Sequence, residues 1–419
     1  MEIAMGFSDV WYEGVLRFFT CLIFVYCIYM GLQQEYIING YYMFSITPLS
    51  LLMYSDSFSP YYLRPLTSST WLFAIINMLV FILAFTFSGR RKTIKISMGY
   101  FKFYDISKGN SKTDSKKLQR HAVALSLLGF LPTLVFFVFH ATMPLSSVIG
   151  FFSYIGIAFA FKSKNRVIII ISILLQAVGF IQDFNKTRLL YLLLTVLLCI
   201  EVYVVDSNIQ RIRYLGIGII LAVIFMLLIA FPLKSFTRTG GNLMDFFQNR
   251  AEISSSAFSY YDNRFHFSGP SFLKMPYMYL VQGWNNLQYV MQTQNTRTYG
   301  LWFVKPLLGY LQIDRFFSEQ YILRPFSSTF NTFTYMAVLF KDFGYYCSII
   351  GSFFLGCFTK AVVRRLHKDC SAFVTASSAL VLMAILEMFF SNHFFGLSYP
   401  FTIVVIGFLY MKFFKLDGY

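Results

Sequence analysis

Long apolar runs recur along this sequence, and they constrain its fold more than any other feature. A helix needs about 20 mostly apolar residues to cross a lipid bilayer. Runs near or above that length occupy residues 15–32, 40–54, 70–88, 122–140, 145–161, 167–182, 189–205, 214–232, 343–363, 372–390 and 398–414. The second and fifth runs are shorter, and each is either a half-span or a tilted helix. The pattern predicts an all-α, polytopic membrane protein with about 11 transmembrane helices.

The composition excludes an ordinary soluble domain. Hydrophobic residues make up 57% of the chain and charged residues only 13%, whereas soluble domains carry about 25% charged residues. The formal net charge is +16, but the basic residues lie mostly in short blocks between apolar runs. Such blocks set orientation in a membrane and contact anionic lipid headgroups. We therefore expect membrane lipid, and no nucleic acid, as a partner.

The basic blocks also predict an orientation. Segment 89–120 carries ten basic residues against Asp105 and Asp114, which predicts a cytoplasmic loop. The blocks at 162–166, 211–213, 364–368 and 412–415 agree with this when the spans alternate. The N-terminus then lies on the outer side of the membrane and the C-terminus in the cytoplasm.

Three parts follow from this topology. Residues 1–232 hold about eight transmembrane helices, and residues 342–419 hold about three. Between them lies 233–341, a weakly hydrophobic segment on the outer side with more basic than acidic residues. Those charges are either simply solvated or form a surface that holds an anion. Loops of this length are usually functional or disordered, and the aromatic content here argues against disorder.

Motifs for nucleotide or metal chemistry are absent from the sequence. It has no Walker glycine loop, no H-E-x-x-H, no G-x-S-x-G, no D-x-D and no C-x-x-C. These absences argue against ATP hydrolysis, a zinc site and a serine hydrolase. An enzyme of this composition would act on a membrane-delivered substrate, and we expect neither a metal nor another cofactor.

Two cationic positions are candidates for a site. Arg188, with Lys186 two residues earlier, lies where a short outward turn returns to the membrane. A cation at membrane depth is costly unless it is paired or faces water, so Arg188 is either a site residue or a snorkelling anchor. Arg238 precedes Gly240 and Gly241, where backbone amides and a guanidinium could converge on a phosphate; the alternative is a flexible exit from the helix.

Other candidates lie in the outer segment and just after it. Arg264 and His266 occur in a polar, aromatic stretch, where His266 is either a general base or a solvated loop histidine. Asp342 stands at the beginning of an apolar run, and an acid there must pair with a cation or take part in chemistry. His393, in a short outward turn, is a further candidate for the same cavity.

One local motif carries a family resemblance. The chain has Asn331-Thr-Phe-Thr-Tyr335, then Asp342-Phe-Gly344, then a span containing Gly351 and Gly356. Here it resembles the bacterial oligosaccharide repeat-unit polymerases, the Wzy-type O-antigen polymerases. Weaker support comes from Arg238, from 279–286 and from 300–306, and the arrangement of spans around one large outer loop covers the whole chain.

The resemblance implies a fold similar to the lipid-carrier-dependent, GT-C-like glycosyltransferases. It also implies a location in the bacterial inner membrane, with the N-terminus in the periplasm and the C-terminus in the cytoplasm. It implies transfer of a growing glycan from undecaprenyl diphosphate to a new lipid-linked repeat, with a chain-length regulator protein as a further partner. Asp342 or His266 would act as base or orienting acceptor, and Arg188 and Arg238 would stabilise the diphosphate. The expected substrate-binding residues are Lys186, Arg264, Asn331, Thr334, Tyr335 and His393. The alternatives are an O-antigen ligase, which would differ only in its acceptor, and a flippase for lipid-linked oligosaccharides, which would more often show two similar halves.

Overall fold

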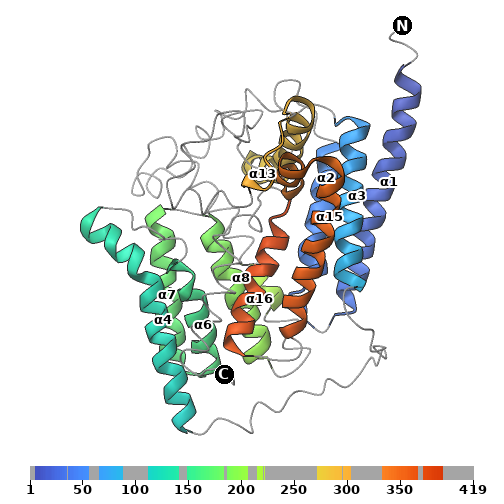
Figure 1. Ribbon diagram of the computed structural model, residues 1–419. Helices are drawn as coiled ribbons and strands as arrows, with labels where there is room; N and C mark the ends of the chain where they lie inside the picture. The colour runs from blue at the N-terminus through green and yellow to red at the C-terminus, as the bar shows by residue number, and fades with distance from the viewer. Residues whose placement is uncertain are drawn as a thin grey trace.

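The computed structural model describes residues 5–34, 36–55, 66–87, 112–140, 149–183, 186–205, 215–219, 221, 271–294, 296–302, 333–366 and 371–389. Within these ranges the regular elements are helices, and no strand occurs (Figure 1). Their bounds are α1 Met5–Leu32, α2 Gly40–Ser55, α3 Ser68–Phe87, α4 Lys112–Phe139, α6 Phe152–Lys162, α7 Arg166–Asp183, α8 Lys186–Tyr203, α13 Ser271–Thr293, α15 Tyr335–Leu366 and α16 Ala372–Leu386. The all-α prediction is thus confirmed for the described part of the chain.

Among the described residues, four helical stretches are long and apolar enough to cross a membrane: Tyr12–Leu32, Ser68–Phe87, Ser115–Phe139 and Tyr335–Leu366. Large apolar side chains on α1 are exposed, among them Phe18 at 61% and Tyr29 at 58%. Such a surface suits lipid rather than water, because lipid tails are as apolar as the side chains. These features indicate a membrane-embedded protein, while the number of crossings stays a prediction.

Two of the shorter apolar runs form short helices. α6 has 11 residues, which span roughly 17 Å at 1.5 Å per residue. α2 has 16 residues and contains Pro48, and it spans roughly 24 Å by the same rise. Both helices are shorter than the roughly 30 Å hydrocarbon core of a bilayer.

Hydrogen bonds between helices define two opposite ends of the bundle. At one end, Glu201 near the end of α8 accepts hydrogen bonds from the backbone N–H groups of Ile37 and Ile38, between α1 and α2, at 2.5 and 3.1 Å. The hydroxyl groups of Tyr203 and Thr375 lie 2.8 Å apart at the same end, where α8 finishes and α16 begins. Figure 1 shows α4 beginning and α15 finishing here as well.

Basic side chains gather at this end, which we name the basic end. They belong to the start of α4, the turn between α6 and α7, and the last turns of α15: Lys116, Lys117, Arg120, Lys162, Lys164, Arg166, Lys360, Arg364 and Arg365. The pairing of α4 with α6 agrees, because the ring of His121, early in α4, lies 6.1 Å from that of Phe159, late in α6. The segments predicted to be cytoplasmic therefore share one end wherever the structure describes them.

The opposite end carries α13, and we name it the α13 end. There the Tyr154 hydroxyl donates to the backbone oxygen of Arg188 at 3.1 Å. The Tyr335 N–H donates to the backbone oxygen of Met388 at 3.0 Å, so α15 begins beside the end of α16. α13 packs across α2, α3 and α15 (Figure 1). Its tryptophan, Trp284, donates from Nε1 to Ser50 Oγ of α2 at 3.0 Å.

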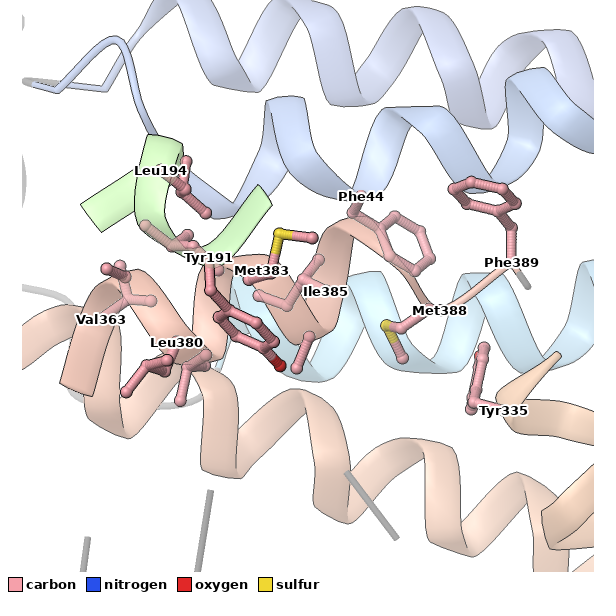
Figure 2. Close-up of a cluster of buried hydrophobic side chains, with 14 of the residues drawn as sticks. Phe44, Tyr191, Leu194, Tyr335, Val363, Leu380, Met383, Ile385, Met388 and Phe389 are labelled. Atoms are coloured by element: carbon pink, nitrogen blue, oxygen red, sulfur yellow. The ribbon is translucent and has the colours of Figure 1, made fainter. Parts of the chain in front are cut away.

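The core is built around α16. This helix contacts α2, α6, α8 and α15, and nearly all its side chains are buried. Figure 2 shows Met383 of α16 and Met388, just after it, together with Phe44 of α2, Tyr191 of α8 and Tyr335 of α15. α3 and α15 also pack side by side, with Ser352 Oγ donating to Asn77 Oδ1 at 2.6 Å between them.

α15 begins earlier than the apolar run predicted. The run starts at residue 343, but the helix starts at Tyr335, inside the segment 233–341 that was assigned to the outer loop. Lys341 and Asp342 interrupt the apolar pattern, which is why hydropathy places the start too late. The two halves of α15 meet at Gly344, whose φ of 76° and ψ of −165° are not helical. Asp342 thus lies near the end of the first half of α15, just before the kink, and the apolar run predicted from residue 343 corresponds to the second half.

Candidate functional site at the kink of α15

The first turn of α15 places two of the predicted substrate-binding residues. Thr334 is buried and acts as the N-cap, since its Oγ1 accepts a hydrogen bond from the Ala337 N–H at 3.2 Å. Tyr335 is also buried, and its ring lies 6.4 Å from that of Phe81 in the core (Figure 2). In the described part of the chain, Thr334 thus caps a helix and Tyr335 packs in the core. Their role in substrate binding stays a prediction.

The kink at Gly344 brings a distant segment to α15. A helix that ends leaves its last carbonyl groups without intrahelical donors, and in a membrane protein such groups need other partners. Residues 297–299 supply them. Arg297 Nη1 donates to the Phe340 oxygen at 3.3 Å, Thr298 N to the Lys341 oxygen at 3.1 Å, and Tyr299 N to the Asp342 oxygen at 2.9 Å. The first half of α15 is thus capped from outside its own sequence.

Asp342 holds the same segment through its side chain. Its carboxylate is fully buried. Its Oδ1 accepts a hydrogen bond from Thr298 Oγ1 at 2.5 Å and another from the Trp302 backbone N–H at 3.0 Å. In the structure Asp342 therefore fixes residues 298–302 against α15, which is a positioning contact that the sequence did not reveal.

Arg297 is the cation that this arrangement presents. Its guanidinium lies 4.3 Å from the centre of the Phe340 ring, a cation–π contact. Within the described ranges no carboxylate forms an ion pair with it. Burial lowers the pKa of Arg297, and the neighbouring Tyr299 partly offsets this effect. An arginine nevertheless stays charged, so Arg297 holds a positive charge with donor groups left over for an anion.

Arg188 lies at the same end but on another side of the core. It is in the first turn of α8, and its backbone oxygen accepts from Tyr154. α8 packs on α16, α6 and α7, whereas α15 packs on α3, α16 and α13. α16 thus contacts both helices. Lys186 begins α8, and its side chain lies outside the described part of the structure. A shared pocket for Arg188 and Asp342 stays a prediction.

The remaining candidates cannot be placed in this geometry. Arg238, Arg264, His266, Asn331 and His393 lie outside the described residues. Their roles stay predictions from the sequence.

The described residues contain no group of three or more His, Cys, Asp or Glu side chains that could hold a metal ion. The five described cysteines are free thiols: Cys21, Cys27, Cys199, Cys347 and Cys357. At the kink, a fixed guanidinium can bind an anion, and the buried Asp342 carboxylate holds the segment that carries this guanidinium.

Sequence reasoning missed Arg297, Thr298 and Trp302. In the sequence Arg297 is one of several basic residues of a long loop, and nothing in its neighbourhood distinguishes it. Gly300 and Gly344 could have indicated this contact. A glycine directly after an aromatic residue, Tyr299 or Phe343, can mark a turn of the backbone. Both glycines have positive φ, 89° and 76°.

Comparison with protein-family models, curated proteins and solved structures finds no match to the chain. The features of the chain that bear on function are therefore the chemistry of the kink, the membrane-embedded fold and the motif around Asp342.

Proposed function

We propose that the protein is a polysaccharide repeat-unit polymerase, a glycosyltransferase that uses a polyprenyl-diphosphate-linked oligosaccharide as donor. It would move the growing glycan from undecaprenyl diphosphate to the non-reducing end of a new lipid-linked repeat. One observation carries the proposal: Arg297, without a carboxylate partner in the described ranges, lies at the α13 end beside a buried Asp342. An accessible cation at one end of a helical membrane bundle suits a diphosphate attached to a lipid.

The distribution of charge supports an orientation for this site. Cytoplasmic ends of membrane proteins are enriched in Lys and Arg, and the basic residues of α4, α6, α7 and α15 gather at the basic end. We therefore place the basic end in the cytoplasm of a bacterial cell. The α13 end then faces the periplasm, where a lipid-linked repeat would meet a growing chain.

The proposed reaction needs a cation and a base, and the kink has residues of both types. The acceptor hydroxyl attacks the anomeric carbon of the growing chain, a new glycosidic bond forms, and the bond from that carbon to the diphosphate oxygen breaks. The diphosphate leaves with negative charge on its carrier, and Arg297 would stabilise that charge. The hydroxyl proton passes to a base, for which Asp342 and His266 are the candidates. Arg188 and Arg238 stay candidates for a second phosphate contact.

Asp342 also has a positioning role in this proposal. Because Asp342 binds Thr298 and the Trp302 N–H, it fixes the segment that carries Arg297. A fixed cation costs no reorganisation at the moment of reaction. Holding two lipid-linked sugars beside it would supply rate through orientation.

The banding pattern of surface polysaccharide in a deletion strain tests the reaction class. Loss of a polymerase leaves single repeats capped on the surface lipid. Loss of a ligase or of a flippase leaves that lipid without any repeat. Single repeats support the proposal, and a bare surface lipid contradicts it.

The substitution Arg297→Lys tests the site. A lysine keeps the charge but not the bidentate geometry, so we expect polymer formation to fall by roughly 100-fold, as when a transition-state donor is removed. Arg17→Lys is the matched control, because Arg17 is an ion-paired arginine on α1, bound to Glu13 at 2.7 Å. Polymers of normal length from Arg297→Lys would exclude Arg297 from the reaction.

A further inference from the structure

Gln282 is a buried side chain whose polar atoms are unused. It lies in α13, is fully buried, and neither Nε2 nor Oε1 has a hydrogen-bond partner in the described part of the chain. A carboxamide has two donor and two acceptor positions. An amide that is buried without partners is destabilising. Natural proteins usually keep such a group only where something else, such as water or a ligand, can pair with it.

Neighbouring polar residues of α13 show that this helix otherwise satisfies its buried groups. Gln288 Oε1 accepts from the Thr67 backbone N–H at 2.7 Å. Trp284 Nε1 donates to Ser50 Oγ at 3.0 Å. Each of these side chains joins α13 to the adjacent part of the bundle. Gln282 makes no such link, so a role in packing α13 does not explain it.

The backbone beside Gln282 is held close to α15 and to the end of α16. A Cβ atom at Gly283 would lie 2.2 Å from the backbone oxygen of Phe389 and 3.1 Å from Thr334 Cγ2. Only glycine permits so close an approach. Phe389 follows the end of α16, and the preceding residue, Met388, accepts a hydrogen bond from the Tyr335 N–H at the beginning of α15; Figure 2 labels all three residues. Gln282 therefore sits on a segment whose position is fixed by three helices.

This segment lies near the kink site. Thr334 contacts Gly283, and Phe340 contacts Arg297. These two residues are six positions apart on α15, a rise of about 9 Å. Gln282 therefore belongs to the stretch of α13 that packs beside the first half of α15, the half that ends at the kink site.

We infer that Gln282 is a sugar-binding residue that recognises hydroxyl groups of the lipid-linked oligosaccharide. The inference rests on the proposed function. A carboxamide is neutral and presents a donor beside an acceptor, which matches a pair of neighbouring sugar hydroxyls. A buried amide that awaits hydroxyl groups also rejects ligands that lack them, because its own groups then stay unpaired. Gln282 thus contributes to the choice of repeat unit.

Gln282→Met tests the inference, with Gln288→Met as the matched control on the same helix. Methionine is close in volume and removes the amide. Because the amide of Gln282 is unpaired, Gln282→Met should melt in detergent at or above the wild-type temperature, yet form polymer about tenfold more slowly. Gln288→Met leaves the Thr67 N–H without its acceptor and breaks a link between α13 and the start of α3, so it should melt below the wild type. A Gln282→Met protein that melts like Gln288→Met, or that polymerises at the wild-type rate, overturns the inference.

A binding measurement separates this inference from the proposed function. The probes are the lipid-linked repeat extracted from the deletion strain and undecaprenyl diphosphate without sugar. We expect both to raise the melting temperature of the wild type, the sugar-bearing probe more strongly, and we expect Gln282→Met to lose only that difference. If neither probe stabilises the wild type, the proposed function fails. If both probes stabilise the wild type equally, or if Gln282→Met keeps the difference between them, only the role of Gln282 is refuted. This is the result expected if a water molecule pairs with the amide.

Discussion

Replacing Gly344 by alanine should destabilise the protein and displace Arg297. The backbone of Gly344, with φ 76° and ψ −165°, lies in a region that is essentially restricted to glycine, and holding another residue in such a region costs about 1–3 kcal/mol. The new Cβ would also lie 3.2 Å from Arg297 Nε. The guanidinium must then move away from Phe340. We therefore expect a loss of stability of about 1–3 kcal/mol, together with reduced polymer formation.

Thermal unfolding in detergent and the length of the polymer measure the two effects. Gly14→Ala is the control, because a Cβ at Gly14, in the helix α1, meets nothing within 4 Å. Alanine has the higher helix propensity by up to about 1 kcal/mol, so Gly14→Ala should be neutral or stabilising and fully active. If Gly344→Ala has the same melting temperature as Gly14→Ala, the positive φ at the kink is refuted.

A double variant separates backbone strain from the contact with Arg297. In the Arg297→Ala background the side-chain contact is absent, so Gly344→Ala should cost less there than in the wild type. The difference is the interaction energy of neighbouring residues, typically about 0.5–3 kcal/mol. Equal costs in both backgrounds would show that the guanidinium does not lie against Gly344.

Two further substitutions test hydrogen bonds at opposite ends of the bundle. Thr298→Val removes the donor to the buried Asp342 carboxylate, and hydrogen bonds to charged groups contribute about 1.5–3 kcal/mol. Thermal unfolding should show this loss of stability in Thr298→Val but not in Thr298→Ser, which keeps the hydroxyl group. Equal melting temperatures of the two variants would argue against the contact. Glu201→Gln places an amide where a carboxylate accepts from the Ile37 and Ile38 N–H groups, so one donor loses its partner at a cost of about 1–3 kcal/mol. A wild-type melting temperature for Glu201→Gln would contradict this part of the fold.

Hydropathy predicted the buried helices well where apolar residues are continuous. The run at 70–88 corresponds to α3, Ser68–Phe87. It failed where polar residues belong to a helix. The first turn of α4 contains charged residues, and the first half of α15 contains Lys341 and Asp342, so both helices begin earlier than their apolar runs. α13 was not predicted because its buried face includes Gln282 and Gln288, residues that a hydropathy pattern assigns to a loop.

The candidate site was only partly predictable for a different reason. An acid beside an apolar run is conspicuous, and Asp342 could be singled out from this alone. Its partners are about 40 residues away in the chain, and they reach it only because the kink at Gly344 exposes backbone carbonyls. The residues around Arg297 in the sequence do not distinguish it from a solvated cation in a loop. Its position depends on three hydrogen bonds that form in the folded protein.

The most direct test of the central claim is a reconstitution in which the purified protein receives the lipid-linked repeat as its only glycan and no nucleotide. Gel analysis of the products should show a ladder of glycans attached to the carrier, with carrier diphosphate released at each step, and Arg297→Lys should abolish the ladder. Absence of a ladder with the wild type, or glycan transfer that occurs only after a lipid A core is added, would contradict the account.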